Sequence, residues 1–298
     1  ALRRRVRGDS TAGALGRQAL PMQWTFAETN PFAGAGGDIA GTALSVSEVL
    51  DCLPCTSQGS VRQHNAAEPN GQVSNSVLST DPPYFDNVMY AELADFFYVW
   101  EKRTLGALWP EFFVDELTNK KDEAVANRAR FAEAGRRAKE LADNDYESKM
   151  AAIFAESRRV LTDDGVMTVM FTHKRADAWD GLGAAVLRAG FTIEASWPVR
   201  TESEQSLHIA KKNSAASTIF LVCRKRAPAD SAESKVYLDD IDADIRDAAR
   251  EALSRGTASG LTGVDLLLST YGPALSVLSQ QWPVYSSEGD DSGQAKLL

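Results

Sequence analysis

Hydrophobic residues from position 73 onward follow patterns that distinguish strands from helices. The segment 73–80 is short, apolar and β-branched, and two prolines stop it, so it is predicted to be a strand. Phe96, Phe97 and Trp100 recur at the spacing of one helix face, which predicts a helix over 91–102. We expect this aromatic stripe to pack in a hydrophobic core.

The middle of the chain continues in the same way. Further helices are followed by a buried strand, another helix, and two strands joined by a polar loop. The predicted helices are 120–142, 146–161 and 178–189, and the predicted strands are 166–171, 191–199 and 218–224. Alternating strands and helices favour a doubly wound α/β sheet, and a last connection without a crossover helix favours a terminal antiparallel pair.

The two ends of the chain differ from this middle. The weaker patterns there predict a helix at 42–50, a strand at 61–65, and helices at 241–253 and 264–278. The last two helices are separated from the sheet by a polar segment. We therefore expect a main domain over residues 1–226 and a small helical appendage with a flexible tail over residues 227–298.

Charge is unevenly distributed between these two parts. The 298 residues include 32 Lys and Arg and 41 Asp and Glu, a formal net charge of −9. Residues 227–298 hold 12 acidic and 5 basic residues, so −7 of this charge lies there and −2 in residues 1–226. A nearly neutral main domain leaves room for a local basic surface. In the basic stretch 198–226, the predicted nucleic-acid contacts are Arg200, Lys211 and Lys212.

Cysteine content and hydropathy bear on the compartment. Three cysteines are too few for a disulfide scaffold, and no apolar run of about 18 residues could span a bilayer. We expect a cytoplasmic protein with no membrane contact. Cys52 and Cys55 form a C-x-x-C without a second ligand pair, so no metal site is predicted. Arginine-rich residues after Ala1 lack the apolar region of a signal peptide, and we expect an internal cut in a longer protein.

The residues that carry the clearest chemistry are Asp81, Pro82, Pro83 and Tyr84, directly after the first predicted strand. In open α/β sheets, ligands bind beyond the carboxyl ends of strands. An exocyclic amine on a nucleobase is a poor nucleophile because its lone pair is delocalised into the ring. The Asp81 carboxylate and the Pro82 carbonyl could accept its hydrogens, Pro83 would stiffen the turn, and Tyr84 could stack on an extruded base. The alternative is a proline-capped strand exit without chemistry.

This tetrapeptide resembles the catalytic motif of amino-methyltransferases that modify N6 of adenine in DNA. The wider segments 26–32, 79–100, 197–202 and 217–224 resemble the large adenine-specific DNA methylases that carry an N-terminal domain of unknown function, over about residues 10–285. The resemblance implies a Rossmann-like methyltransferase sheet, S-adenosyl-L-methionine as cofactor and DNA as substrate. It also implies partner proteins of a restriction or phage-defence system, and it assigns this chain to the C-terminal portion of such a protein.

The same resemblance requires a glycine-rich loop that holds the methionine end of the cofactor. Phe32, Gly34 and Gly36 are the candidates, because glycine lets the backbone approach a ligand closely. The spacing to Asp81 leaves little room for the strand–helix units expected between them. The alternative is an ordinary turn, with the cofactor loop further toward the N-terminus.

Other residues have two interpretations each. His173 follows the predicted strand 166–171 and either flanks the site or lies in an exposed loop. Trp197 is expected in the core. The basic residues of 120–139 either contact DNA or form a solvated helix face.

Two other functions stay open. One keeps the chemistry but changes the substrate to RNA or to N4 of cytosine. The other is a non-catalytic nucleic-acid-binding fragment that lacks its cofactor half. The loop at Phe32–Gly36 distinguishes the second alternative from an enzyme.

Overall fold

The computed structural model describes residues 2–4, 11–13, 30, 32, 34, 38–53, 59–60, 62–69, 71, 74–201, 217–227 and 236–285. The chain forms two compact units. One combines Ala1–Gln63 with Leu93–Leu117, and the other combines His64–Glu92 with Thr118–Leu298.

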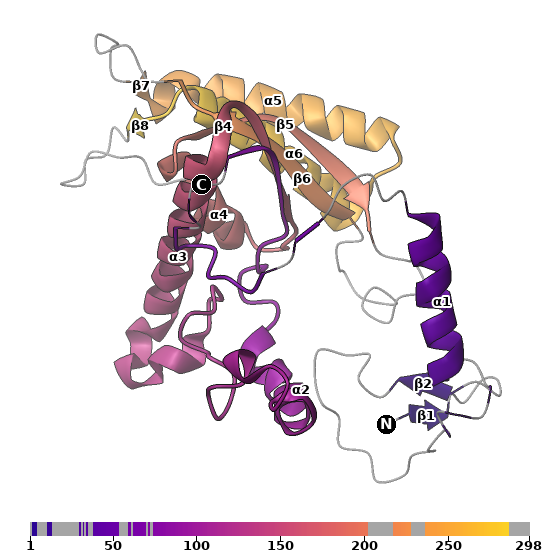
Figure 1. Ribbon diagram of the computed structural model, residues 1–298. Helices are drawn as coiled ribbons and strands as arrows, with labels where there is room; N and C mark the ends of the chain where they lie inside the picture. Colours follow the sequence, from indigo (N-terminus) through magenta and orange to yellow (C-terminus); the bar gives the residue numbers. More distant parts are fainter. Residues whose placement is uncertain are drawn as a thin grey trace. The chain divides into compact units, whose positions relative to one another are not determined.

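The second unit contains a mixed four-stranded sheet (Figure 1). Its strands are β3 (Asn75–Thr80), β4 (Leu161–Phe171), β5 (Phe191–Arg200) and β6 (Ser217–Lys225), in the order β3-β4-β6-β5. Strand β3 runs parallel to β4, whereas β6 is antiparallel to both of its neighbours. The strands predicted at 73–80, 166–171, 191–199 and 218–224 and the antiparallel terminal pair are therefore confirmed.

Helices and short strands complete this unit. They are η2 (Arg128–Arg137), α3 (Ala138–Val160), α4 (Ala176–Arg188), β7 (Val236–Tyr237), α5 (Leu238–Ala258), α6 (Gly263–Gln280) and β8 (Val284–Tyr285). Helix α4 ends where Gly190 takes φ +82°, a left-handed conformation that glycine adopts without strain. β7 and β8 pair in parallel beside α5.

One face of the sheet forms the hydrophobic core. Burial alternates along β4 and β6, and the buried positions face each other across the ladder as the pairs Met167–Cys223, Val169–Leu221 and Phe171–Ile219. Trp179 of α4 packs edge-on against Phe171 with ring centroids 5.0 Å apart, and Tyr271 of α6 stacks on Trp179 at 5.2 Å. Intervening strand residues are partly exposed. An α/β fold is confirmed, but helices on both sheet faces are not seen in the ranges described above.

Helices α5 and α6 share this core. Ile241 and Ile245 of α5 and Leu268, Leu275 and Leu278 of α6 belong to the same buried cluster as the strands. The Ser279 hydroxyl accepts the backbone N–H of Ile193 at 2.8 Å, which fixes α6 against β5. The sequence boundary drawn after residue 226 therefore does not coincide with a division of the core.

The helices of the first unit contain no buried residue. This unit contains β1 (Leu2–Arg4), β2 (Thr11–Gly13), α1 (Ile39–Cys52), most of α2 (Tyr90–Leu105) and η1 (Pro110–Phe112). The predicted helix at 42–50 is confirmed as α1, which begins after Asp38 caps it by accepting the N–H of Gly41. No residue of α1 or α2 is buried. No helix among the described residues is long and apolar enough to cross a bilayer.

Two core predictions were wrong. Phe96, Phe97 and Trp100 of α2 are exposed, because helical spacing shows which side chains share a face but not what covers it. Phe96 and Phe97 pack edge-on against each other instead. Trp197 is also outside the core, with 63% of its surface exposed, because a register shift between Ile193 and Ala195 disrupts the alternation along β5.

Two element predictions were also wrong. Residues 62–65 form no strand, because the Asn65 side chain accepts the N–H of Ala67 and makes a local turn. The helix expected over 120–142 starts late: Asn127 caps the short η2, Gly135 at φ +58° interrupts it, and the α-helix begins at Ala138.

Candidate functional site

The tetrapeptide Asp81–Tyr84 leaves the carboxyl end of β3. Thr80, the last residue of β3, pairs with Val169 of the parallel strand β4, which ends two residues later at Phe171. The loops after β3 and β4 therefore emerge at the same sheet edge. This is the position predicted for the motif.

Asp81 and Tyr84 interact electrostatically. Burial, followed by the interaction of the Tyr84 hydroxyl with the Asp81 carboxylate, raises the pKa of the tyrosine. The Tyr84 ring packs edge-on against Phe171, with centroids 5.5 Å apart. The Asp81 carboxylate is exposed and can accept more hydrogen bonds, since its two oxygens offer about four sites.

The charge of Asp81 extends to a second tyrosine. Burial raises the pKa of Tyr90, with smaller contributions from the negative charges of Asp81 and Glu123. Glu123 itself accepts the backbone N–H of Ala91 at 2.9 Å, in the first turn of α2. The site is therefore acidic and lined by phenolic groups that stay protonated at neutral pH.

The two prolines differ in how their carbonyls are used. The Pro83 carbonyl accepts the Tyr146 hydroxyl from α3 at 3.0 Å and the N–H of Phe85 at 3.0 Å. Within the described ranges, the Pro82 carbonyl accepts no hydrogen bond. Pro82 can therefore serve a ligand, while Pro83 fixes the turn.

Phe85 turns the chain inward. Its backbone adopts φ +56°, which is rare for a residue with a side chain, and its ring is buried. The ring packs edge-on against Tyr146 at 5.1 Å and against His173 at 5.7 Å. The Phe85 carbonyl accepts the N–H of Ala126 at 3.1 Å.

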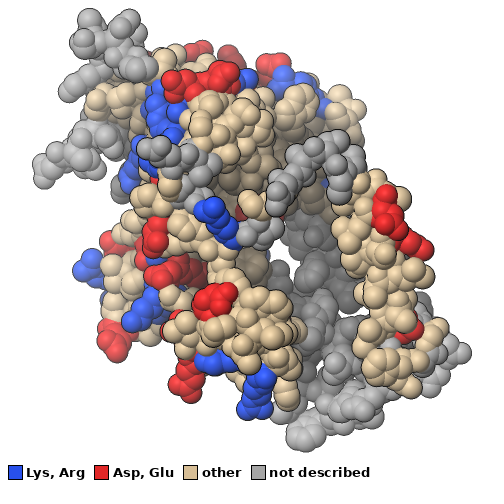
Figure 2. Space-filling model, viewed as in Figure 1, with Lys and Arg blue, Asp and Glu red and all other residues tan. Residues whose placement is uncertain are grey.

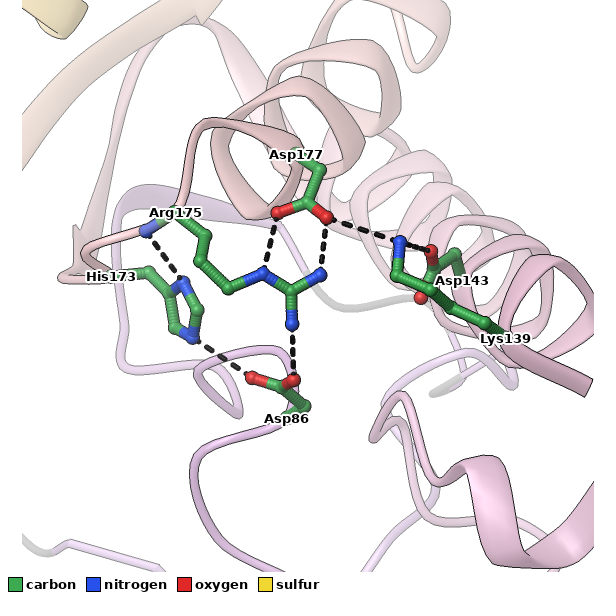
Figure 3. Close-up of polar contacts among 6 residues, drawn as sticks. All are labelled: Asp86, Lys139, Asp143, His173, Arg175 and Asp177. Carbon is green, nitrogen blue, oxygen red and sulfur yellow. Dashed lines mark hydrogen bonds and ion pairs between the residues drawn. The ribbon is translucent and has the colours of Figure 1, made fainter.

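A polar network lies behind this turn (Figure 3). Asp86 accepts from Nε2 of His173 at 3.0 Å and from Nη1 of Arg175 at 2.6 Å. Nε of Arg175 also donates to Asp177 at 2.9 Å, and Lys139 bridges Asp177 to Asp143. Burial lowers the pKa of His173, whose side chain is almost completely enclosed. Of the two interpretations of His173, the exposed loop is wrong.

Arg175, Asp177 and Tyr146 were not singled out in the sequence. Arg175 and Asp177 flank the first residue of α4, in the loop that follows β4. Their position after the end of a strand is the sequence feature that could have marked them as site residues. Tyr146 had none, because its partner Pro83 lies 63 residues away.

The remaining predicted site residues have different positions. Phe32 and Gly34 belong to the first unit; Phe32 is 77% exposed, Gly34 takes φ +69°, and a Cβ built there would meet no atom within 4 Å. Gly36, Lys211 and Lys212 lie outside the described residues. Arg200 is exposed at the end of β5. Among the described residues, no group of acidic, His or Cys side chains could hold a metal ion.

A hollow of about 660 Å³ lies beside η2 and is lined by Arg128, Ala129, Ala132, Gly135, Arg136 and Ala138. Neither Arg128 nor Arg136 has an ion-pair partner in the part of the chain that the structure describes, whereas neighbouring Arg130 pairs with Asp145. Ala126 and Asn127, just before the hollow, contact Phe85 and Glu92. Elsewhere, basic and acidic side chains lie interspersed on the face that Figure 2 shows.

Comparisons with known proteins give no relationship to argue from. No protein-family model matches the chain, and neither curated proteins nor solved structures yield a match.

Proposed function

We propose that this protein is an S-adenosyl-L-methionine-dependent methyltransferase that modifies the exocyclic N6 amine of adenine in DNA. The observation that carries the proposal is the arrangement of Asp81, Pro82 and Tyr84 at the carboxyl end of β3. An exposed carboxylate, a carbonyl that accepts no hydrogen bond from any described residue, and an aromatic ring packed against Phe171 lie within four residues.

The acceptor amine needs these groups. Two amine hydrogens would be donated, one to an Asp81 oxygen and one to the Pro82 carbonyl. This arrangement draws the nitrogen lone pair out of conjugation and meets the positive charge that develops on nitrogen. Tyr84 would stack on the extruded base, and its edge-on contact with Phe171 holds its ring in place. Transfer would be direct, without a covalent enzyme intermediate.

The cofactor side is less complete. S-adenosyl-L-methionine would supply an electrophilic methyl group bound to sulfur. The described residues of the expected loop, Phe32 and Gly34, are open to solvent and form no cradle by themselves. The residues that support the proposal are therefore those of the acceptor side, Asp81, Pro82 and Tyr84.

Contacts to the DNA backbone belong to the same proposal. Arg128 and Arg136 line the hollow beside η2. The two residues just before it are bonded to the region of the motif, because Ala126 donates to the Phe85 carbonyl and Asn127 donates to Glu92. Unpaired guanidinium groups suit phosphate oxygens. Arg200, Lys211 and Lys212 remain predicted contacts.

The test is transfer of a labelled methyl group from S-adenosyl-L-methionine to DNA. Asp81→Ala is expected to abolish transfer while circular dichroism and the unfolding midpoint stay unchanged. Asp163→Ala is the matched control, because Asp163 is an exposed aspartate paired with Lys225. Transfer at the wild-type rate with Asp81→Ala would reject the assignment.

The alternatives are separated by two further measurements. Methylated RNA or N4-methylcytosine among the digested products would change the substrate but keep the chemistry. Calorimetry with S-adenosyl-L-methionine separates an enzyme from a non-catalytic nucleic-acid-binding fragment. DNA binding by folded protein, without cofactor binding, would support the fragment.

A further inference from the structure

We infer that Asp86, His173 and Arg175 form a clamp that positions Asp81 and Tyr84 for the reaction. None of the three is placed against the base, so they are positioning residues. The inference rests on the proposed function for its catalytic consequence. Its structural part, the holding of the loop after β3, can be tested separately.

The loop needs to be held because its backbone is unfavourable. Phe85 occupies the left-handed region at φ +56°, where a bulky side chain is uncommon. Such a conformation persists only when surrounding contacts enforce it. Phe85 directly follows Tyr84, so relaxation of this residue would move the tyrosine ring.

Two clamp residues and Tyr146 pack against the ring of Phe85. The rings of His173 and Tyr146 contact it edge-on, and the Arg175 guanidinium lies 5.5 Å from its centroid. Asp86, the next residue, accepts one hydrogen bond from His173 and one from Arg175. The aromatic ring and the carboxylate of adjacent residues are therefore held by the same two partners.

The bonding at His173 fixes its tautomer. The backbone N–H of Arg175 donates to Nδ1 at 3.2 Å, so the ring proton resides on Nε2 and is donated to Asp86. The indole N–H of Trp179 donates to the His173 carbonyl at 2.9 Å. A neutral imidazole satisfies every one of these contacts. Its burial, with only 1% of the side chain exposed, leaves it no room to turn.

Arg175 is oriented from its other side. Its guanidinium donates to Asp177 through Nε and Nη2, and Lys139 donates to Asp177 at 3.2 Å (Figure 3). The fork geometry of arginine allows it to bind two carboxylates at once. The position of Asp86 is thus fixed relative to the start of α4.

The clamp connects the loops of the two parallel strands. His173 lies two residues after Phe171, against which the Tyr84 ring packs, and Asp86 lies two residues after Tyr84. The bonds of Asp86 to His173 and Arg175 therefore fix the position of the Tyr84 ring against Phe171. This relation makes the clamp specific to the motif and distinguishes it from a general stabilising ion pair.

The experiment compares Asp86→Asn with wild-type protein by steady-state methyl transfer and by hydrogen exchange. Asparagine keeps the shape but loses the charge that holds Arg175. We expect kcat to fall roughly tenfold or more, since misplacement on the order of 1 Å can cost about a hundredfold, while KM for S-adenosyl-L-methionine stays unchanged. The amides of Phe85 and Asn87, bonded to Pro83 and Tyr84, should exchange at least about tenfold faster.

Two substitutions at His173 test whether the bond from Nε2 to Asp86 is the one that holds the loop. Gln at position 173 can reach Asp86 as Nε2 does, whereas Asn at that position can replace only Nδ1. His173→Gln should therefore retain more kcat and more amide protection than His173→Asn. Glu194→Gln, which breaks a comparable exposed ion pair with Arg224 elsewhere on the sheet, is the control and should change neither.

The outcomes separate the two claims. Unchanged exchange at Phe85 and Asn87 in Asp86→Asn would overturn the clamp, whatever the activity. Faster exchange with no methyl transfer by wild-type protein would support the clamp as a structural tie and reject the proposed function. Faster exchange with kcat within twofold of wild type would overturn the positioning role. If Asp86→Asn does not fold, Arg175→Lys gives the same comparison, because it keeps a charge but loses the fork.

Discussion

The phenolic hydroxyl of Tyr146 in α3 donates to the carbonyl of Pro83 at 3.0 Å, across 63 residues of sequence. Tyr146 is fully buried, and burial raises the pKa of its hydroxyl, so the group stays a donor throughout the accessible pH range. The bond ties the second proline of the motif to the helix that precedes β4.

Replacing Tyr146 by Phe should destabilise the protein modestly. The substitution removes one buried hydrogen bond but leaves the Pro83 carbonyl bonded to Phe85, so about 1 kcal/mol of unfolding free energy should be lost. Urea denaturation measures this change. Tyr98→Phe removes a tyrosine bond to a backbone carbonyl in the more exposed first unit and should cost less. An equal cost at both positions would contradict the importance of burial.

Replacing Tyr84 separates the role of the ring from that of the hydroxyl. Tyr84→Phe keeps the ring against Phe171 and removes the hydroxyl that interacts with Asp81, so kcat/KM should stay within about tenfold of wild type. Tyr84→Ala removes the stacking surface, which is worth about 1–3 kcal/mol per base, and should lower kcat/KM by roughly 5- to 150-fold. Methyl-transfer kinetics at fixed pH test this order. A larger loss with Phe than with Ala would reject stacking.

Asp180 of α4 should make stability depend on pH. Burial, followed by the charge of Asp177, raises the pKa of Asp180 to about 6, and its buried Oδ1 has no partner among the described residues. The folded-state pKa of Asp180 is above the unfolded value of about 3.9. The contribution of Asp180 to the free energy of unfolding is therefore most favourable below pH 4, where the carboxyl is protonated in both states, and this advantage is lost as pH rises through 6. Asp180→Asn should therefore stabilise the protein at pH 7, by on the order of 1 kcal/mol after allowance for solvent screening, and should have little effect at pH 4.

Denaturation of Asp180→Asn and wild type at pH 4, 5, 6 and 7 checks this sign. Burial lowers the pKa of His173, which acts in the opposite sense, but this contribution is common to both proteins and cancels. Asp163→Asn, at a fully exposed position, is the control and should give parallel curves. A difference that grows toward acid would contradict the assignment.

Arg128 and Arg136 should change the salt dependence of DNA binding. The logarithm of the DNA-binding constant falls linearly with the logarithm of the salt concentration, and each phosphate contact adds about 0.9 to the magnitude of this slope. Arg128→Ala and Arg136→Ala should each lower the slope by about 0.9, uniformly across DNA sequences. Arg246→Ala, which removes a cation paired with Asp242 on α5, should leave it unchanged. Equal slopes for all three variants and wild type would exclude the hollow from the DNA-contact surface.

The periodicity of the chain predicted most elements of the second unit because their burial is regular. Met150 and Phe154 recur on the buried face of α3, and β4 and β6 contain the short apolar runs Val166–Phe171 and Ile219–Cys223, whose burial alternates in the structure. The start of β4 at Leu161 was not predicted. Asp163 and Gly165 usually break structure, but here they lie within the strand, between the buried residues Leu161 and Met167.

The position of Asp81–Tyr84 directly after a strand was predictable, whereas the residues that hold this segment were not. Asp81–Tyr84 is a local pattern, and its position after a strand follows from the prolines. Arg175 reaches Asp86 across 89 residues, and only the parallel pairing of β3 with β4 brings them together. A pattern of neighbouring residues in the sequence cannot predict a contact between residues so far apart. In the first unit, the exposed face of α2 shows the converse: a regular apolar pattern without a described partner.

The position of β6 has a consequence for how the protein is made. The last strand of the sheet to be synthesised lies between β4 and β5, so neither of these can complete its ladder until residue 225 has left the ribosome. A nascent chain that ends before Ser217 leaves the apolar faces of both strands without their central partner. The sheet can therefore be completed only late in translation, when β6 is inserted between β4 and β5, and we expect shorter nascent chains to expose apolar surface that favours aggregation.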